Sequence, residues 1–221
     1  MQSVLSLLTS LMLWCSVLSA CTSCYPGQQA NAKNLAMSCG PAGNSSCPSS
    51  QSTTYSIGNY YPASLANDGL YPPQNQQFTS TNGDAHPWWM VDFGSQQAVG
   101  SVTLYNRPYC CPTRLNGFQI WLGNNHTLNG DGNSMCYSST PAADVSHNTP
   151  PFIQSFECIG IGRYVFVTLP NSQILSLSEV QIFAPCQNCS AGSYSTSPLQ
   201  LCSACGPGSY SETGNQLNCR F

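Results

Sequence analysis

Fourteen cysteines in a chain of 221 residues constrain this sequence more than any other feature. Apart from Cys15, they fall into three groups, within residues 21–47, 110–158 and 186–219. Cysteine usage this high is typical of oxidising compartments, where disulfides staple loops and small domains. We therefore expect an extracellular, loop-rich protein and not a cytosolic enzyme.

Charged residues are unusually scarce. Five Lys and Arg and eight Asp and Glu make up 6% of the chain, with a net charge of −3, whereas an average soluble domain has about 25%. A chain without a basic face is a poor partner for phosphate backbones, so we expect no nucleic-acid binding. Because 41% of the residues are hydrophobic, the low charge does not predict disorder.

Residues 1–20 carry no charge, are mostly apolar and end in small residues, as in a secretory signal peptide. A buried N-terminal helix is the alternative, but the segment lacks a polar face and a cap. Residues 18–21 also have the form of a bacterial lipoprotein box, although no Lys or Arg precedes the apolar run. No other stretch approaches a membrane span. Sequons that fit a secretory route predict N-glycosylation at Asn44, Asn125 and Asn188.

Residues 186–221 contain a repeat, CQNCSAGSYSTSPLQL followed by CSACGPGSYSETGNQLN. Units this small need staples, and although the Cys-x2-Cys pairs would also fit a zinc ribbon, the secretory signal favours disulfides. The spacing leaves the connectivity open; the expected pairs are Cys189–Cys202 and Cys205–Cys219. The tail resembles the cysteine-rich repeats of ephrin-receptor and TNF-receptor type ectodomains. It ends within a repeat, which predicts a fragment or a partner cysteine on another chain.

Residues 48–185 lie between this tail and a cysteine-rich head at residues 21–47, and they have the pattern of an all-β domain. Turn-rich segments at 129–134 and 141–151 separate short apolar alternations, and no stretch of ten residues keeps a helical period. This pattern predicts a single antiparallel β-sandwich. The expected strands are residues 99–105, 117–122, 152–158, 163–169 and 179–183.

Two of the few cations, Arg107 and Arg114, flank the adjacent Cys110 and Cys111 in a segment that joins two expected strands. Successive Cα atoms lie about 3.8 Å apart, whereas ordinary disulfides span about 4.4–6.8 Å. The two cysteines therefore either form a strained bridge, of the kind that persists at binding sites, or pair with distant cysteines. The forked donors of arginine suit the oxygens of a neutral sugar as well as anions.

Five motifs in order make the sequence similar to a known family. Together they resemble the F-type lectins, or fucolectins, a branch of the discoidin-like jelly rolls, over roughly residues 50–184. The resemblance implies a galactose-binding-like jelly roll and a non-catalytic lectin that binds L-fucose or related 6-deoxy sugars on fucosylated glycans. The motifs are SLANDG at residues 64–69, PWWMVDFG at 87–94, NRPYCCPTRL at 106–115, GRYV at 162–165 and LSEV at 177–180.

In that family a His and two Arg bind the polar edge of fucose, and a disulfide between adjacent cysteines lies against the sugar. The family His maps by spacing to Ser80, with His86 as an alternative imidazole, and the Asp of the loop motif is Tyr109 here. The resemblance thus implies a carbohydrate site made of Ser80, His86, Arg107, Tyr109, Cys110, Cys111 and Arg114, with Cys110 bridged to Cys111.

Two further family disulfides bear on this chain. Cys136 and Cys158 match one of them, and we expect them to be paired. The other family bridge falls at Phe78 and Ser178, and the loss of both cysteines together is what a dropped disulfide leaves behind.

The resemblance also implies a structural Ca²⁺ near the sugar site. Its acids carry over to Asp68 and Glu179, and Leu65, Leu70 and Ser178 complete the expected set, the leucines through backbone carbonyls. Hard oxygen ligands suit Ca²⁺. The alternatives are an ordinary turn at Asp68 and an exposed strand residue at Glu179.

Weak affinity for single sugars predicts that such a lectin acts as a homo-oligomer or within a larger extracellular assembly. A structural or adhesive module with a decayed sugar site is the alternative, because the family His and Asp are absent. An enzyme is disfavoured, since the eight acids are scattered and no catalytic motif occurs.

Overall fold

The computed structural model describes residues 28–29, 33–57, 60–71, 77–108, 110–140, 152–185, 187–188, 193–194 and 203–204. The chain divides into two compact units, one of residues 31–185 and one of residues 1–30 with 186–221. The predicted signal peptide and the predicted pairs Cys189–Cys202 and Cys205–Cys219 lie outside the described residues.

The larger unit is made of antiparallel strands, which confirms the predicted all-β class. Its main sheet has the order β2-β4-β7-β5-β6, and β9 pairs with β4 beside this path. A separate two-stranded sheet joins β3 to β8. The strands are β2 Ser49–Gln51, β3 Thr79–Ser80, β4 Trp88–Tyr105, β5 Gln119–Gly123, β6 Asn133–Ser138, β7 Ile153–Thr168, β8 Ser176–Leu177 and β9 Glu179–Phe183.

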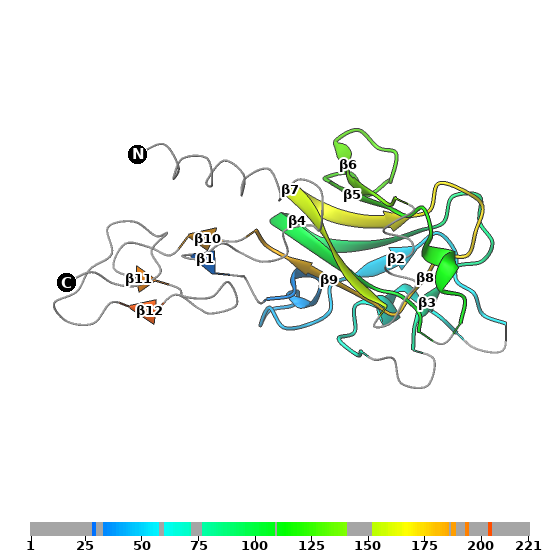
Figure 1. The fold of residues 1–221 in the computed structure, drawn as a ribbon, viewed down its shortest axis with the longest axis horizontal. Helices are drawn as coiled ribbons and strands as arrows, with labels where there is room; N and C mark the ends of the chain where they lie inside the picture. Colours follow the sequence, from blue (N-terminus) through cyan, green and yellow to red (C-terminus); the bar gives the residue numbers. More distant parts are fainter. Residues whose placement is uncertain are drawn as a thin grey trace, which may run out of the picture. The chain divides into compact units, whose positions relative to one another are not determined.

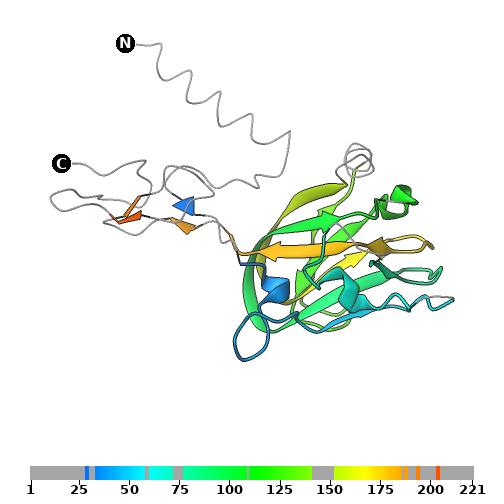
Figure 2. The ribbon, with the colours of Figure 1, turned by 90° about the horizontal axis from the view of Figure 1, so that it is seen from below.

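The long strands β4 and β7 pair with each other along nearly their whole length. The first part of β4 also pairs with β2, and its last part pairs with β9. Register shifts interrupt the pairing between Asp92 and Gln97 and between Val99 and Ser101. Irregularities of this kind let a strand bend from one layer of a sandwich into the other. Figures 1 and 2 show both strands as long, curved ribbons.

The strands predicted at residues 152–158 and 163–169 form the single strand β7. The glycines between them, Gly160 and Gly162, do not end the strand; they allow β5 to approach closely. A Cβ at Gly162 would lie 2.6 Å from Leu122 Cδ1, and one at Gly160 would lie 2.8 Å from Leu122 Cδ2. Glycine in a strand here marks close packing and not a turn.

The hydrophobic core of the larger unit contains a buried tryptophan. Trp89 is fully buried, and its indole Nε1 donates a hydrogen bond to the Ala63 carbonyl at 2.9 Å. Ala63 begins η2 (Ala63–Ala66), one of three 3-10 helices, and no α-helix occurs in the described part of the chain. Val180 and Ile182 of β9 alternate inward, as their spacing predicts.

The larger unit begins before residue 48, where the sequence pattern placed its start. Leu35 and Ala36 of η1 (Leu35–Met37) are buried in the core with Cys47, which is bridged to Cys39. The Ile182 amide donates to Asn34 Oδ1 at 3.0 Å, which fastens this segment to β9. A three-residue 3-10 turn has no sequence period, so its packing could not be predicted.

Two predicted bridges, Cys110–Cys111 and Cys136–Cys158, are present in the structure. In the smaller unit, β1 (Gln28–Gln29) pairs with β10 (Gln187–Asn188), and β11 (Ser193–Tyr194) pairs with β12 (Ser203–Ala204). Among the described residues, no helix is both long and apolar enough to cross a membrane.

Candidate carbohydrate site

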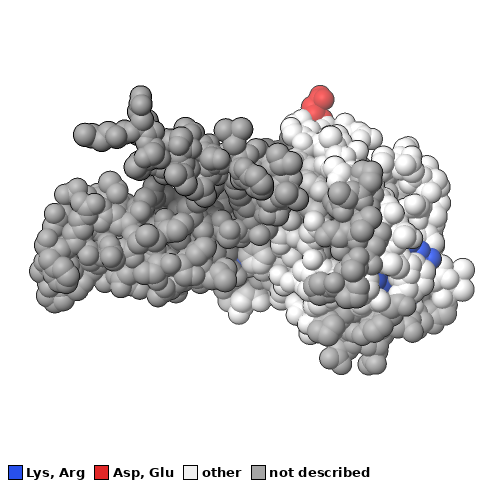
Figure 3. All heavy atoms as spheres, viewed as in Figure 1, with Lys and Arg blue, Asp and Glu red and all other residues white. Residues whose placement is uncertain are grey.

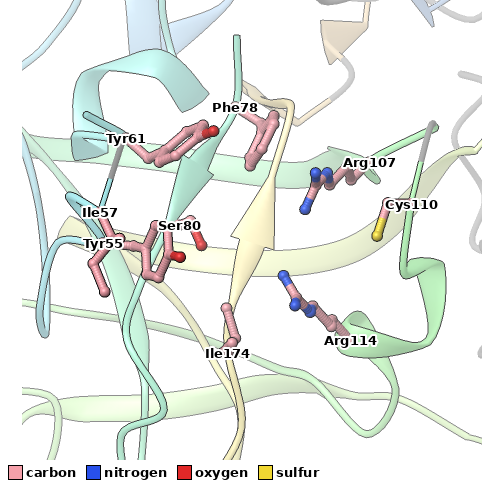
Figure 4. A pocket seen from close by; sticks show the side chains of 9 residues that line it. All are labelled: Tyr55, Ile57, Tyr61, Phe78, Ser80, Arg107, Cys110, Arg114 and Ile174. Atoms are coloured by element: carbon pink, nitrogen blue, oxygen red, sulfur yellow. The ribbon is translucent and has the colours of Figure 1, made fainter. Parts of the chain in front are cut away.

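A pocket of about 350 Å³ opens beside the β3–β8 pair. Figure 4 shows two opposed walls: Arg107, Cys110 and Arg114 on one side, and tyrosines with Ile57 and Ser80 on the other. Small-molecule sites occupy about 300–1,000 Å³, so a monosaccharide fits this volume. The described residues that line it are Tyr55, Ile57, Tyr61, Phe78, Ser80, Arg107, Cys110, Arg114 and Ile174.

The cationic wall is a loop that connects β4 to η3 (Pro112–Leu115). Its base is held by buried Asn106, whose Oδ1 accepts from the Arg107 amide at 2.8 Å and whose Nδ2 donates to the Pro112 carbonyl at 2.9 Å. The Cys110–Cys111 disulfide closes the loop tip, and Cys111 has a φ of 60°, in the left-handed region. These contacts bring Arg107 and Arg114 to the same pocket, as the resemblance implied.

The Arg107 guanidinium lies over the ring of Phe78, with Cζ 3.9 Å from the ring centroid. Its Nε is buried and has no hydrogen-bond partner among the described residues. Burial lowers the pKa of Arg107 below its ordinary value, and the charge of Arg114 lowers it further. The guanidinium is therefore held by an aromatic face that offers it no acceptor oxygen.

The apolar wall consists of residues that the sequence reasoning did not assign to the site. The Tyr61 ring stacks on Phe78 with centroids 4.6 Å apart, and the Tyr55 ring lies 5.9 Å from that of Tyr61. Ile57 is 78% exposed at the pocket rim. The available signal was a run of aromatic residues in a segment without a strand pattern, residues 55–61.

Ser80 lies in the pocket, where the family His was mapped, and its side chain is nearly buried. Its Oγ is 3.2 Å from the Thr81 carbonyl and 3.5 Å from Ser176 Oγ of β8. His86 is not among the lining residues: it is exposed, and its Nδ1 is 2.8 Å from the Pro170 carbonyl. The structure therefore does not bring an imidazole from His86 to this pocket. Tyr109 lies outside the described residues.

A buried carboxylate, that of Glu179, lies at the start of β9. Glu179 is completely buried, and its Oε1 accepts from the Gly69 amide at 3.2 Å. Its Oε2 is buried without a partner among the described residues, and so is Ser178 Oγ. Desolvation raises the pKa of Glu179 to about 8, and the charge of Asp68 contributes. Glu179 is therefore not the exposed strand residue that was the alternative expectation.

Asp68 lies in a tight turn beside Glu179. Its Oδ1 accepts from the Leu70 amide at 2.9 Å, and Gly69 between them has a φ of +79°. Burial raises the pKa of Asp68, although the backbone hydrogen bonds oppose this. Two desolvated carboxylates with an unpartnered oxygen fit a hard divalent cation, whose charge would offset their repulsion. Of the two expected carbonyl ligands, Leu65 is half-buried and Leu70 is exposed.

The sequons differ in accessibility. Asn44 is exposed, whereas Asn125 is half-buried, with Oδ1 accepting from the Thr127 amide at 3.0 Å. The side chain of Asn188 lies outside the described part of the structure.

Comparison with known proteins finds a family model that matches part of the chain. Residues 65–167 match the NedA-like, galactose-binding domain. The matched residues include Ser80 and both pocket arginines. Four lining residues, Tyr55, Ile57, Tyr61 and Ile174, lie outside the matched range, so most of the apolar wall comes from flanking segments.

Curated proteins similar to this chain include several fucolectins. Fucolectin-6 of Anguilla japonica is 41% identical over 106 residues, which are 48% of this chain and 53% of that protein. The pentraxin fusion protein of Xenopus laevis is 39% identical over 106 residues, 47% of this chain and 24% of its own length. The chain spans about half the length of the fucolectins it matches.

Two solved structures are similar in fold to this chain. The lectin domain of lectinolysin, complexed with Lewis B antigen, is 26% identical with a TM-score of 0.53 and covers 70% of this chain and 98% of its own. The fucolectin from the serum of Morone saxatilis, striped bass, is 28% identical with a TM-score of 0.56, covering 73% of this chain and 54% of its own.

Proposed function

We propose that the protein is a secreted, non-catalytic lectin whose pocket binds L-fucose or a related 6-deoxy sugar on glycans. The observation that carries this proposal is the convergence of Arg107, Arg114 and the Cys110–Cys111 disulfide on one pocket. The fucolectin relatives and the lectinolysin domain complexed with Lewis B antigen support the same ligand class.

The two walls divide the recognition of such a sugar. Guanidinium groups donate several hydrogen bonds in a fixed plane, which suits adjacent hydroxyl and ring oxygens. Ser80 Oγ adds a hydroxyl that donates or accepts. The side chains of Tyr55, Ile57 and Tyr61, with the Cys110 sulfur, offer apolar surface to the methyl group and the less polar side of a 6-deoxy ring.

A glycan array tests this proposal directly. The full chain is expected to bind fucosylated glycans, and Arg114→Lys should weaken the binding because a point charge replaces the planar fork. Arg163→Lys is the matched control, since Arg163 pairs with Asp92 outside the pocket. If the folded protein binds no glycan on the array, a structural or adhesive module is favoured instead.

We also propose that Asp68 and Glu179 hold a Ca²⁺ ion near the pocket. The buried, unpartnered Oε2 of Glu179 supports this, because a bound cation would satisfy it. Calcium at about a hundredfold excess over its Kd should stabilise the fold by about 2.7 kcal/mol. Differential scanning fluorimetry with calcium or chelator measures this shift. It should vanish in Glu179→Gln and persist in Glu157→Gln, whose exposed side chain lies on β7.

Secretion and assembly complete the proposed function. The charge-free, apolar residues 1–20 support export, which expression with and without this segment tests by following protein in the medium. Because single-sugar binding is weak, a homo-oligomer or larger extracellular assembly would raise avidity. Light scattering of the secreted protein gives the number of copies.

A further inference from the structure

The pocket is cationic in a protein that is acidic overall. The chain has a net charge of −3, with five Lys and Arg among 221 residues. Two of these five cations, Arg107 and Arg114, line the same pocket, and Figure 4 shows their guanidinium groups on one wall with the Cys110 sulfur. In the face shown in Figure 3, charged atoms of the described residues are sparse. Concentrating two rare cations at one site requires an explanation.

The described carboxylates do not neutralise this pair. Asp92 forms its ion pair with Arg163 at 2.7 Å, and Asp84 accepts hydrogen bonds from two hydroxyl groups. The segment between the two arginines, PYCCPT at residues 108–113, contains no acid. None of the described acids lines the pocket; they are Asp68, Asp84, Asp92, Asp131, Glu157 and Glu179.

The excess of positive charge in the pocket leaves the Arg107 Nε without an acceptor among the described residues. This Nε is buried, and the guanidinium lies on the Phe78 ring. Burial lowers the pKa of Arg107 and the charge of Arg114 lowers it further, while Tyr61 opposes the shift. A ring face attracts a cation but accepts no in-plane N–H bond. A neutral sugar would supply acceptor oxygens and leave the repulsion between the two arginines unchanged.

We infer that the preferred ligand of this pocket is a glycan with an anionic substituent, a sulfate ester or a carboxylate, bound between Arg107 and Arg114. This inference rests on the proposed function and changes its ligand class from a neutral to a charged sugar. An anion accepts forked hydrogen bonds from both guanidinium groups and offsets their mutual repulsion. The apolar wall of Tyr55, Ile57 and Tyr61 remains available to the sugar ring, which distinguishes a charged glycan from a free inorganic anion.

The test compares ligands that differ by one charge. Calorimetric titration of the full chain, with calcium present, uses L-fucose and its 2-, 3- and 4-monosulfates, and D-galactose with D-galacturonate. At least one anionic sugar should bind about tenfold tighter than its neutral parent, as expected for a charge-assisted bidentate contact. The advantage should shrink between about 20 mM and about 500 mM salt, because the ions screen the contact. The sulfate and carboxylate arms identify which anion is recognised.

Variants assign any preference to the two arginines. Arg107→Gln and Arg114→Gln should each remove most of the preference for the charged sugar, whereas Arg107→Lys should retain part of it because the charge remains. Arg163→Gln is the matched control and should keep the wild-type preference for the charged sugar, because Arg163 pairs with Asp92 outside the pocket. Thermal melts identify variants that fail to fold. If one arginine variant does not fold, the variant of the other arginine tests whether the preference depends on the pocket cations.

The outcomes separate this inference from the proposed function. Equal binding of fucose and every anionic sugar, or rejection of all anionic sugars, would overturn the inference and leave a neutral fucose lectin. Binding of charged sugars without binding of fucose would uphold the inference and overturn recognition of neutral fucose. Competition by inorganic sulfate as strong as that of the best charged sugar would overturn the inference, since the site would then bind the anion without recognising the sugar. Failure of every ligand to bind folded protein would overturn both.

Discussion

Phe78→Leu is expected to weaken sugar binding because the Phe78 ring supports the Arg107 guanidinium at the pocket. The Arg107 Cζ is 3.9 Å from the ring centroid, and the ring is only 3% exposed. Leucine keeps an apolar side chain at this position and removes the ring quadrupole. The guanidinium would then lose the contact that fixes its orientation, because its Nε has no acceptor among the described residues.

The size of this effect follows from the exposure of the pair. Cation–π contacts contribute about 0.5–1 kcal/mol at exposed sites and about 2 kcal/mol when desolvated. Arg107 is half-buried, so we expect a loss of about 1 kcal/mol, or about fivefold in Kd. The fold itself should lose roughly 1–2 kcal/mol, because the ring also stacks on Tyr61.

Calorimetric titration with the best sugar measures the affinity, and urea unfolding measures the stability. The matched control is Phe156→Leu: Phe156 is 2% exposed and packs on Phe118 and Tyr137, none of which lines the pocket. Both variants should lose stability, and only Phe78→Leu should lose affinity. Equal affinity losses in the two variants, or unchanged affinity in Phe78→Leu, would refute the argument that the ring positions Arg107.

Three further changes test the framework around the site. Asn106→Ala removes both hydrogen bonds that hold the base of the arginine loop, so stability should fall by roughly 1–3 kcal/mol and sugar affinity with it, measured by unfolding and titration. Replacing Cys136 and Cys158 by Ala opens a loop with a sequence separation of 22 and should cost about 3 kcal/mol in urea unfolding, without changing affinity. Hydrogen bonding to Arg163 lowers the pKa of Asp92, so this pair stabilises the fold above about pH 4 and the benefit disappears as the pH falls below it. Asp92→Asn should therefore flatten the acid side of the melting-temperature profile.

The fold class could be predicted because it depends on local patterns. Alternating residues such as Val180 and Ile182 face the core as their period of two requires. The continuity of β7 could not be predicted, because Gly160 and Gly162 have the same sequence signal whether they end a strand or admit a close neighbour. Their role depends on Leu122, which lies far away in the sequence.

Part of the candidate site could likewise be predicted from the sequence, and part could not. Arg107 and Arg114 were found because cations are rare in this chain and the two share one short loop. The opposite wall, with Tyr61 and Phe78, was missed because its residues come from different segments that only the fold brings together. The burial of Glu179 was likewise hidden, since a charged residue beginning a strand is usually exposed.

One short segment, residues 176–179, connects the pocket to the Glu179 carboxylate. Ser176 Oγ lies 3.5 Å from Ser80 Oγ at the pocket, and Glu179 accepts the Gly69 amide three residues further along. Between them, the Ser178 amide donates to the Tyr105 carbonyl at 2.8 Å, at the end of β4.

Tyr105 ends the strand from which the arginine loop begins, and buried Asn106, the next residue, anchors that loop. A cation bound at Glu179 would therefore hold, through this one segment, both the Ser80 side of the pocket and the root of the Arg107 wall. Calcium should tighten sugar binding for this reason, and not because the ion touches the sugar. Since coupling between two binding sites is reciprocal, the sugar must then tighten calcium binding by the same factor. Equal sugar affinities with calcium and with chelator would mean that the segment transmits nothing between the two sites.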